Sequence, residues 1–103
     1  MTKSFKSYYA VIFTSIQTDN TEGYDEMAST MEELAKLQPG YLGIDSARNE
    51  VGITISYWEN LEAIKNWKQE TEHLKTQLKG RTQWYDWYHV RICKVEREYE
   101  FNS

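Results

Sequence analysis

Residues 38–74, QPGYLGIDSARNEVGITISYWENLEAIKNWKQETEHL, hold the signals that decide the fold. Pro39 and Gly40 end a preceding helix, because proline cannot continue one and glycine readily adopts the backbone angles found just past a helix end. Two runs rich in β-branched and aromatic residues follow, at 41–48 and 51–58, joined by a polar Asn-Glu turn. Their composition and separation predict a β-hairpin.

The end of this stretch predicts a helix. Asn60 is a natural N-cap, and Thr71 interrupts the apolar pattern that follows it, so we expect a break near residues 69–71. The helix should close at Lys79-Gly80. The apolar residues recur at helical spacing and are Leu61, Ile64, Trp67, Leu74 and Leu78.

Three further elements complete the expected fold. Residues 5–16 and 84–101 predict strands with apolar side chains on both faces, the second unusually long. Residues 22–37 predict an amphipathic helix on which Leu37 ends the apolar stripe. We interpret its acidic residues as a solvent-facing surface rather than a metal site. The order β-α-β-β-α-β in one domain, residues 1–103, is typical of the ferredoxin-like α+β fold, with a four-stranded antiparallel sheet and both helices on one face.

The second face of that sheet needs a cover. Two helices on one side shield one face only, whereas the first and last strands are apolar on both. A second copy of the chain is the simplest cover. We therefore expect a homodimer in which two sheets pack into a dimeric α+β barrel. The end of the long last strand would cross to the partner.

Composition excludes several classes of function. The formal net charge of −4 disfavours binding to nucleic acid or to an anionic membrane. Cys93 is the only cysteine, so it forms no internal disulfide or multi-cysteine metal site, and its apolar surroundings predict a packed residue. The sequence contains no phosphate-binding loop and no metal-ligand cluster. It also contains no signal peptide and no apolar run of membrane-spanning length, so we expect a cytoplasmic protein.

Aromatic residues make up 15% of the chain, with four Trp and eight Tyr. Tyrosine and tryptophan favour interfaces and pocket walls, where one end of the side chain stays polar. The excess is explained by a dimer face, by a pocket for a flat ligand, by both, or by rings that simply fill the strands.

The segments PGYLG, SYWEN and LEAIKNWKQETEHLK, in this order, resemble the antibiotic biosynthesis monooxygenase (ABM) family. The resemblance implies a small homodimeric α+β barrel. Its best-understood members oxidise anthrones with O2 and use no metal, flavin or haem: a phenolic substrate loses a proton, and the resulting carbanion reacts with oxygen. The residues that match the family pattern are Pro39, Gly40, Gly43, Trp58, Ala63, Trp67 and His73.

In such enzymes the site on the second helix consists of an Asn, a Trp four residues on and a Tyr six further. Trp67 matches the Trp as a pocket wall, whereas Ala63 stands at the Asn position and His73 at the Tyr position. By this resemblance His73 would transfer protons, since imidazole exchanges them near neutral pH. The alternative interpretation is that His73 is a hydrogen-bonded helix residue at the pocket rim, without a role in catalysis. Trp58 and His89 are further candidates for substrate contact, and His89 is alternatively a packed or interface residue.

Two arginines and the position of a haem ligand are further points of comparison. Arg81 and Arg91 are either anion partners or members of ordinary ion pairs. A haem-degrading branch of the superfamily carries an Asn in the first strand and an iron-ligating His ten residues after the helix Trp. Here Gln77 occupies that position and the first strand contains no Asn. Because Gln is a poor ligand for haem iron, haem degradation is the least favoured of the functions considered. The resemblance to the anthrone-oxidising members implies that the protein binds no cofactor.

Two functions remain open. The first is an ABM-type monooxygenase that oxidises a flat phenolic or quinol-like molecule with O2. The second is a non-catalytic small-molecule-binding or stress-response dimer that keeps the pocket. Ala63 favours the second function, because it removes a hydrogen-bonding group from the position of the family's Asn.

Overall fold

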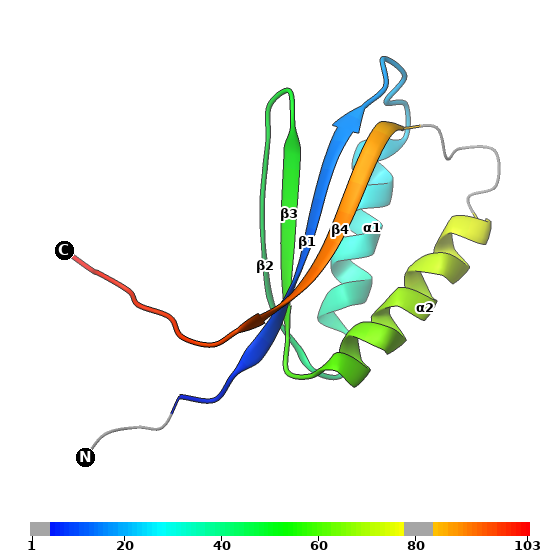
Figure 1. The fold of residues 1–103 in the computed structure, drawn as a ribbon. Coiled ribbons are helices and arrows are strands. Elements are labelled where there is room, and N and C mark those ends of the chain that lie inside the picture. Colours follow the sequence, from blue (N-terminus) through cyan, green and yellow to red (C-terminus); the bar gives the residue numbers. More distant parts are fainter. Residues whose placement is uncertain (1–4, 78–83) are drawn as a thin grey trace.

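The fold was examined in a computed structural model that describes residues 5–77 and 84–103, without the side chains of residues 75–77. The four strands form one antiparallel sheet in the order β2-β3-β1-β4. Both helices lie on the same side of it (Figure 1), so the ferredoxin-like α+β prediction is confirmed. The elements are β1 (Tyr8–Gln17), α1 (Tyr24–Lys36), β2 (Tyr41–Arg48), β3 (Gly52–Trp58), α2 (Leu61–Gln77) and β4 (Tyr85–Val95).

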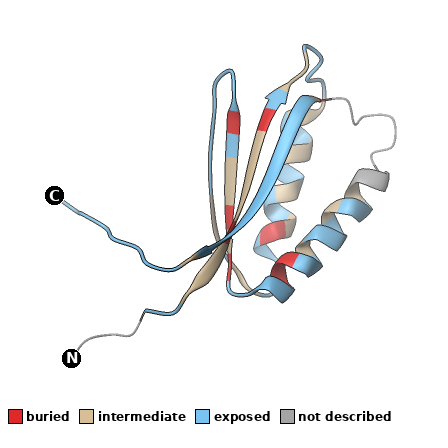
Figure 2. Ribbon diagram, viewed as in Figure 1, coloured by how far each residue is buried: buried red, intermediate tan, exposed pale blue. Residues whose placement is uncertain are grey.

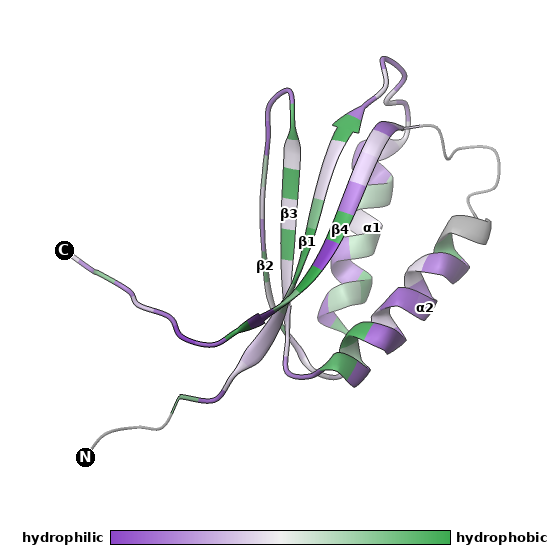
Figure 3. Ribbon diagram, viewed as in Figure 1, coloured by the Kyte–Doolittle hydropathy of each residue, from purple (hydrophilic) through white to green (hydrophobic). Residues whose placement is uncertain are grey.

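Strand register places residues in rows across the sheet. Arg48 pairs with Gly52, Gly52 with Ser15, and Ser15 with Tyr88. Because side chains alternate between the two faces, every second row points toward the helices. We call this side the helix face and the other side the open face. Figure 3 shows the alternation as hydrophobic bands along β3 separated by bands of intermediate hydropathy.

The core lies on the helix face, where the end of α1 and the start of α2 meet β3 (Figure 2). Trp58 is fully buried there, and its indole Nε1 donates a hydrogen bond of 2.8 Å to the Ser56 hydroxyl. This bond satisfies the polar atom of the largest buried ring. The rest of the core cluster consists of Ala35, Ala63 and Ile64, with Tyr9, Val11, Tyr41 and Trp67 packed against it.

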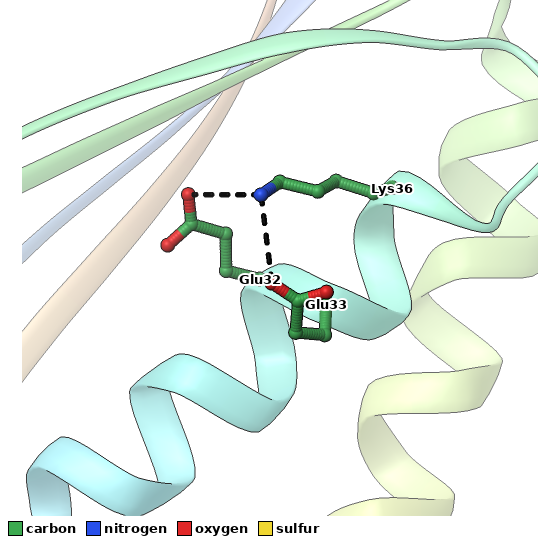
Figure 4. A network of polar contacts seen from close by, with 3 residues as sticks. All are labelled: Glu32, Glu33 and Lys36. Atoms are coloured by element: carbon green, nitrogen blue, oxygen red, sulfur yellow. Dashed lines mark ion pairs between the residues drawn. The ribbon is translucent and has the colours of Figure 1, made fainter.

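The acidic residues of α1 point to solvent, as expected. Lys36 Nζ lies 3.9 Å from a carboxylate oxygen of Glu32 and 3.5 Å from one of Glu33 (Figure 4). These exposed pairs contribute little stability individually. Within residues 5–77 and 84–103, no three His, Cys, Asp or Glu side chains are grouped as a metal ion would require.

The prediction that the last strand reaches Phe101 was wrong. β4 ends at Val95, which pairs with Tyr8 at the start of β1. Beyond that pair the described residues offer no neighbouring strand, so the ladder stops. One contact continues past it, because the Tyr8 hydroxyl donates a 2.8 Å hydrogen bond to the Glu98 carboxylate. Tyr99 and Phe101 are 87% and 89% exposed.

The expected break in α2 was also wrong. The helix is continuous from Leu61 to Gln77, and the Thr71 hydroxyl donates a 2.7 Å hydrogen bond to the Lys68 carbonyl. A polar residue therefore stays inside the helix by bonding to the preceding turn. Leu61, expected in the apolar stripe, is 55% exposed because it opens the first turn. Leu78 and the expected end at residues 79–80 lie outside the described residues.

Two further burial predictions failed. Leu37 is 78% exposed, because α1 ends at Lys36 and Leu37 is the C-cap residue that follows it. Cys93 is exposed, since it lies on the open face, which none of the described elements covers. In the part of the chain that the structure describes, neither helix is long and apolar enough to cross a bilayer.

Candidate functional site

Trp67 is a partly buried aromatic side chain on the helix face, next to the core. Its indole stacks on that of Trp58, with ring centroids 5.8 Å apart and an interplanar angle of 27°. Tyr41 packs edge-on against Trp58, with ring centroids 5.7 Å apart. Trp67 is only partly buried, so it presents an aromatic surface whose orientation is set by the core behind it.

Two local features position the helix that carries Trp67. The Asn60 Oδ1 accepts a 2.8 Å hydrogen bond from the Ala63 N–H, which confirms Asn60 as the N-cap. Gly40 has φ = 85°, and a Cβ added there would lie 2.7 Å from the Ala63 Cβ. Its carbonyl accepts a 2.8 Å hydrogen bond from the Glu59 N–H. The Pro-Gly turn is therefore held against the first turn of α2 by a close contact and a hydrogen bond.

Ala63 belongs to this contact. It is 5% exposed and part of the core cluster, packed against the glycine turn. A position that resembles a hydrogen-bonding site in the family thus carries only a methyl group here. Trp58 likewise has no accessible surface, so its contact is with Trp67.

Across the helix face from Trp67, β4 presents three partly exposed apolar residues, which we call the β4 strip. Tyr88, Val90 and Ile92 are 51%, 44% and 53% exposed. They share the helix face because they pair with Ser15, Phe13 and Val11 of β1. Since β3 and β4 flank β1, the strip lies two strand spacings, roughly 10 Å, from β3. The row of Trp58 reaches β4 at Lys94, so Ile92 is the strip residue nearest to that row and Tyr88 the farthest from it.

The two histidines lie apart. His73 is exposed on α2, six residues after Trp67, which places it about 120° around the helix from the core-facing stripe. His89 pairs with Thr14 on the open face, and its ring lies 6.1 Å from that of Trp87. His89 and Trp67 therefore occupy opposite faces of one sheet and share no site within a single chain. Arg91 is also on the open face, whereas Arg81 and the Gln77 side chain lie outside the described residues.

Sequence reasoning missed a cluster at the other end of the helix face. Arg48 Nη2 donates a 2.5 Å hydrogen bond to the hydroxyl of fully buried Ser15. Its guanidinium carbon lies 5.7 Å from the centre of the Tyr24 ring. The Tyr24 and Tyr85 hydroxyls are 3.3 Å apart. No sequence motif predicts this cluster, because its members come from four separate elements, β1, α1, β2 and β4.

Burial is the main cause that raises the pKa of Tyr85, and the hydrogen bond with Tyr24 adds to it. The nearby Arg48 guanidinium opposes this shift without cancelling it. Phe13 stacks on Tyr88 at 5.3 Å and meets Tyr85 edge-on at 5.4 Å. The cluster thus joins a cation and two neutral phenols directly to the β4 strip.

Residues 7–79 match the sequence model of the family described as antibiotic biosynthesis monooxygenase, which covers more than half of the chain. The chain belongs to this family. The ABM match ends within the segment that follows α2, and it includes Trp67 and His73 as well as the glycine turn.

Relatives of this ABM chain are similar along most of their length. The uncharacterized protein YqjZ of Bacillus subtilis (strain 168) is 48% identical over 98 residues, which span 93% of this chain and 86% of that protein. An Asn-to-Ala variant of SnoaB, a cofactor-independent oxygenase from Streptomyces nogalater, has a TM-score of 0.68 at 10% identity. It covers 91% of this chain and 97% of its own.

A third solved structure is MhuD, as an Arg-to-Ser variant with two manganese protoporphyrin IX molecules bound per active site. Its TM-score is 0.62 at 15% identity, with 92% of this chain and 99% of that chain covered. At these identities both solved structures establish the ferredoxin-like ABM fold and nothing finer. The two neighbours also show that proteins of one fold include a cofactor-independent oxygenase and a protein with bound porphyrin.

Proposed function

We propose that this ABM protein is a homodimeric oxygenase that oxidises a flat phenolic or quinol-like molecule with O2 and no bound cofactor. The substrate would bind on the helix face, lose a proton and transfer electrons to O2. For an anthrone the reaction balances when its ring CH2 becomes C=O, with one oxygen atom in the product and the other in water. All four electrons that reduce O2 come from the substrate, so no external reductant is needed.

The observation that carries this proposal is the partly exposed Trp67 indole, fixed by its stack on Trp58, together with the β4 strip on the same face. A flat aromatic ring that binds there exchanges water for apolar contact on its faces. Family membership adds the expectation of oxygen chemistry. Trp67 would serve as the wall of the pocket and Trp58 as the support behind it.

His73 is the proposed proton-transfer residue. It lies on the same helix as Trp67 and at the position of the family's Tyr, and its exposure leaves the imidazole accessible to solvent. Proton transfer by a positioned imidazole typically contributes about 10²–10⁴-fold to a rate. His89, on the open face, belongs in this proposal to the dimer interface rather than to the substrate site of its own chain.

The proposed dimer covers the open face. Ile16, Ile53 and Trp87 are 40%, 43% and 46% exposed on that side, and no other element of the described chain lies over them. Rings and β-branched residues gathered on a sheet face are usually buried by a second layer. A second copy supplies a layer of the same chemistry.

A non-catalytic binding dimer is the second candidate. Burial of Ala63 at 5% exposure favours it, because the helix offers no hydrogen-bonding group at that point of the site. Such a protein would bind aromatic molecules on the same surface and leave O2 unchanged.

Oxygen consumption by metal-free protein with a panel of anthrones and quinols tests the two functions. The comparison is wild type, His73→Ala and the control Gln69→Ala, which changes an exposed residue of the same helix. Turnover that is lost only in His73→Ala supports the oxygenase and its proton-transfer residue. Turnover that His73→Ala retains refutes the role of His73. Absence of turnover above the spontaneous rate, with binding intact, selects the binding dimer.

A further inference from the structure

The cluster around Arg48 has a property that the core does not require. Arg48 starts at the edge strand β2, yet its guanidinium reaches Ser15 on β1, across the whole width of β3. That distance is two strand spacings, about 10 Å. Gly52 lies between Arg48 and Ser15 and leaves room for the guanidinium because it has no side chain. A side chain at this position would overlap the guanidinium.

This geometry holds a cation in place without neutralising it. Ser15 and the Tyr24 ring are its contacts, and Arg48 forms no ion pair with any carboxylate within the residues that the structure describes. A guanidinium has five N–H donors in a planar fork, of which the bond to Ser15 uses one. The remaining donors suit an oxygen anion, which a guanidinium binds in bidentate fashion.

The cation is also aligned with the proposed substrate surface. Arg48, Gly52, Ser15 and Tyr88 form one row of the helix face, so the row that carries the guanidinium ends at the first residue of the β4 strip. The stack of Phe13 on Tyr88 makes the neighbouring surface aromatic. An anion held by Arg48 would therefore carry its ring toward the strip.

We propose that Arg48 is an anion-binding residue and that the ligand of this protein is an aromatic ring bearing an oxygen anion, a carboxylate or a phenolate. The ring would lie along Tyr88 and Val90, and its anionic group would meet the guanidinium, with the Tyr24 hydroxyl, which accepts from Tyr85, as a further donor. This inference rests on the proposed function for the β4 strip as the aromatic surface, and it adds the charge and the acidic group of the ligand.

Calorimetric titration at low ionic strength tests the proposal with three probes: 2-naphthoate, its neutral analogue 2-naphthamide, and 2,4-dinitro-1-naphthol, which is a phenolate at pH 7.5. Wild type is expected to bind at least one anionic probe about tenfold more tightly than the amide. Arg48→Gln should abolish this preference and change the affinity for the amide less than about twofold. Which anionic probe is preferred distinguishes a carboxylate site from a phenolate site.

Two variants separate the possible failures. Arg97→Gln removes an exposed arginine beyond the end of β4 and should keep the preference, which excludes a general effect of net charge. Arg48→Lys retains the charge but loses the fork, and it should restore only part of the preference. Thermal melts of all variants check that the loss of the Ser15 bond leaves the protein folded.

The outcomes are distinct. Equal binding of anionic and neutral probes refutes the anion site and leaves the aromatic site intact. A preference that survives in folded Arg48→Gln refutes the assignment to Arg48. Failure of every probe to bind at millimolar concentration contradicts both the inference and the proposed function.

Discussion

Replacement of Gly40 by alanine tests how the glycine turn positions the helix that carries Trp67. Two separate costs act at this position. The backbone has φ = 85°, which an alanine adopts at a cost of about 1–2 kcal/mol. The new Cβ would also lie 2.7 Å from the Ala63 Cβ, and overpacking of this kind costs about 1–3 kcal/mol. We expect Gly40→Ala to lower the free energy of unfolding by about 2–5 kcal/mol.

Two other glycines serve as matched controls. Gly23 has φ = 81°, but a Cβ there would meet only Trp84 Cζ2, at an ordinary 3.8 Å. Gly23→Ala therefore measures the backbone cost alone, about 1–2 kcal/mol. Gly43 has no positive φ, and its added Cβ would lie 3.9 Å from the Tyr57 ring. Gly43→Ala should change stability by less than about 0.5 kcal/mol.

The double variant Gly40→Ala/Ala63→Gly isolates the clash. It removes the Cβ that the new methyl would strike, so a double-mutant cycle should return a favourable coupling of about 1–3 kcal/mol while the backbone cost remains. The cycle also requires Ala63→Gly alone. Urea unfolding followed by tryptophan fluorescence measures all six proteins, at one fixed protein concentration because association shifts apparent stability. The reasoning is refuted if Gly40→Ala is no worse than Gly23→Ala, or if Ala63→Gly restores nothing.

Three further predictions concern the core, the aromatic cluster and the dimer. Ser56→Ala removes the acceptor of the buried Trp58 N–H and should cost about 1–3 kcal/mol in urea unfolding, whereas a change within error would show that water replaces the hydroxyl. The pKa of Tyr85 is raised from 10.0, so the folded chain keeps a proton that the unfolded chain releases. Stability should therefore fall above about pH 10 by up to about 1.4 kcal/mol per pH unit. Tyr85→Phe should flatten that slope, and an unchanged alkaline slope would contradict the raised pKa. Ile53→Glu places a charge on the open face and should convert a dimer into a monomer in light scattering at micromolar concentration. A monomeric wild type would refute the dimer itself.

Local chemistry made most of the fold predictable. The strand at residues 41–48 was predicted to the residue, and Asn60 was correctly identified as the N-cap of α2. These features depend on side chains acting within a few residues of themselves, such as a cap that bonds to the first turn. The alternation along β3 and the order of elements similarly follow from short-range periodicity.

The wrong predictions concern features that depend on another segment of the chain or on a specific hydrogen bond. Apolar residues continue past Val95, but a strand needs a neighbour to bond with, and β1 begins only at Tyr8. Cys93 was predicted to be packed because its neighbours in the sequence are apolar. The sequence does not show which face of the sheet the helices cover, and Cys93 is exposed. Thr71 looked like a break because its pattern does not show the bond to Lys68.

The sequence by itself therefore determined the order of elements, the glycine turn and the family, together with the candidacy of Trp67 and His73 on one helix. Only the tertiary structure decided that Ala63 is buried against Gly40, that His89 lies on the other face from Trp67, and that Arg48 reaches Ser15 over Gly52. The physical reason is that periodicity and capping act over a few residues. In contrast, the pairing register that assembles a site joins strands far apart in the chain.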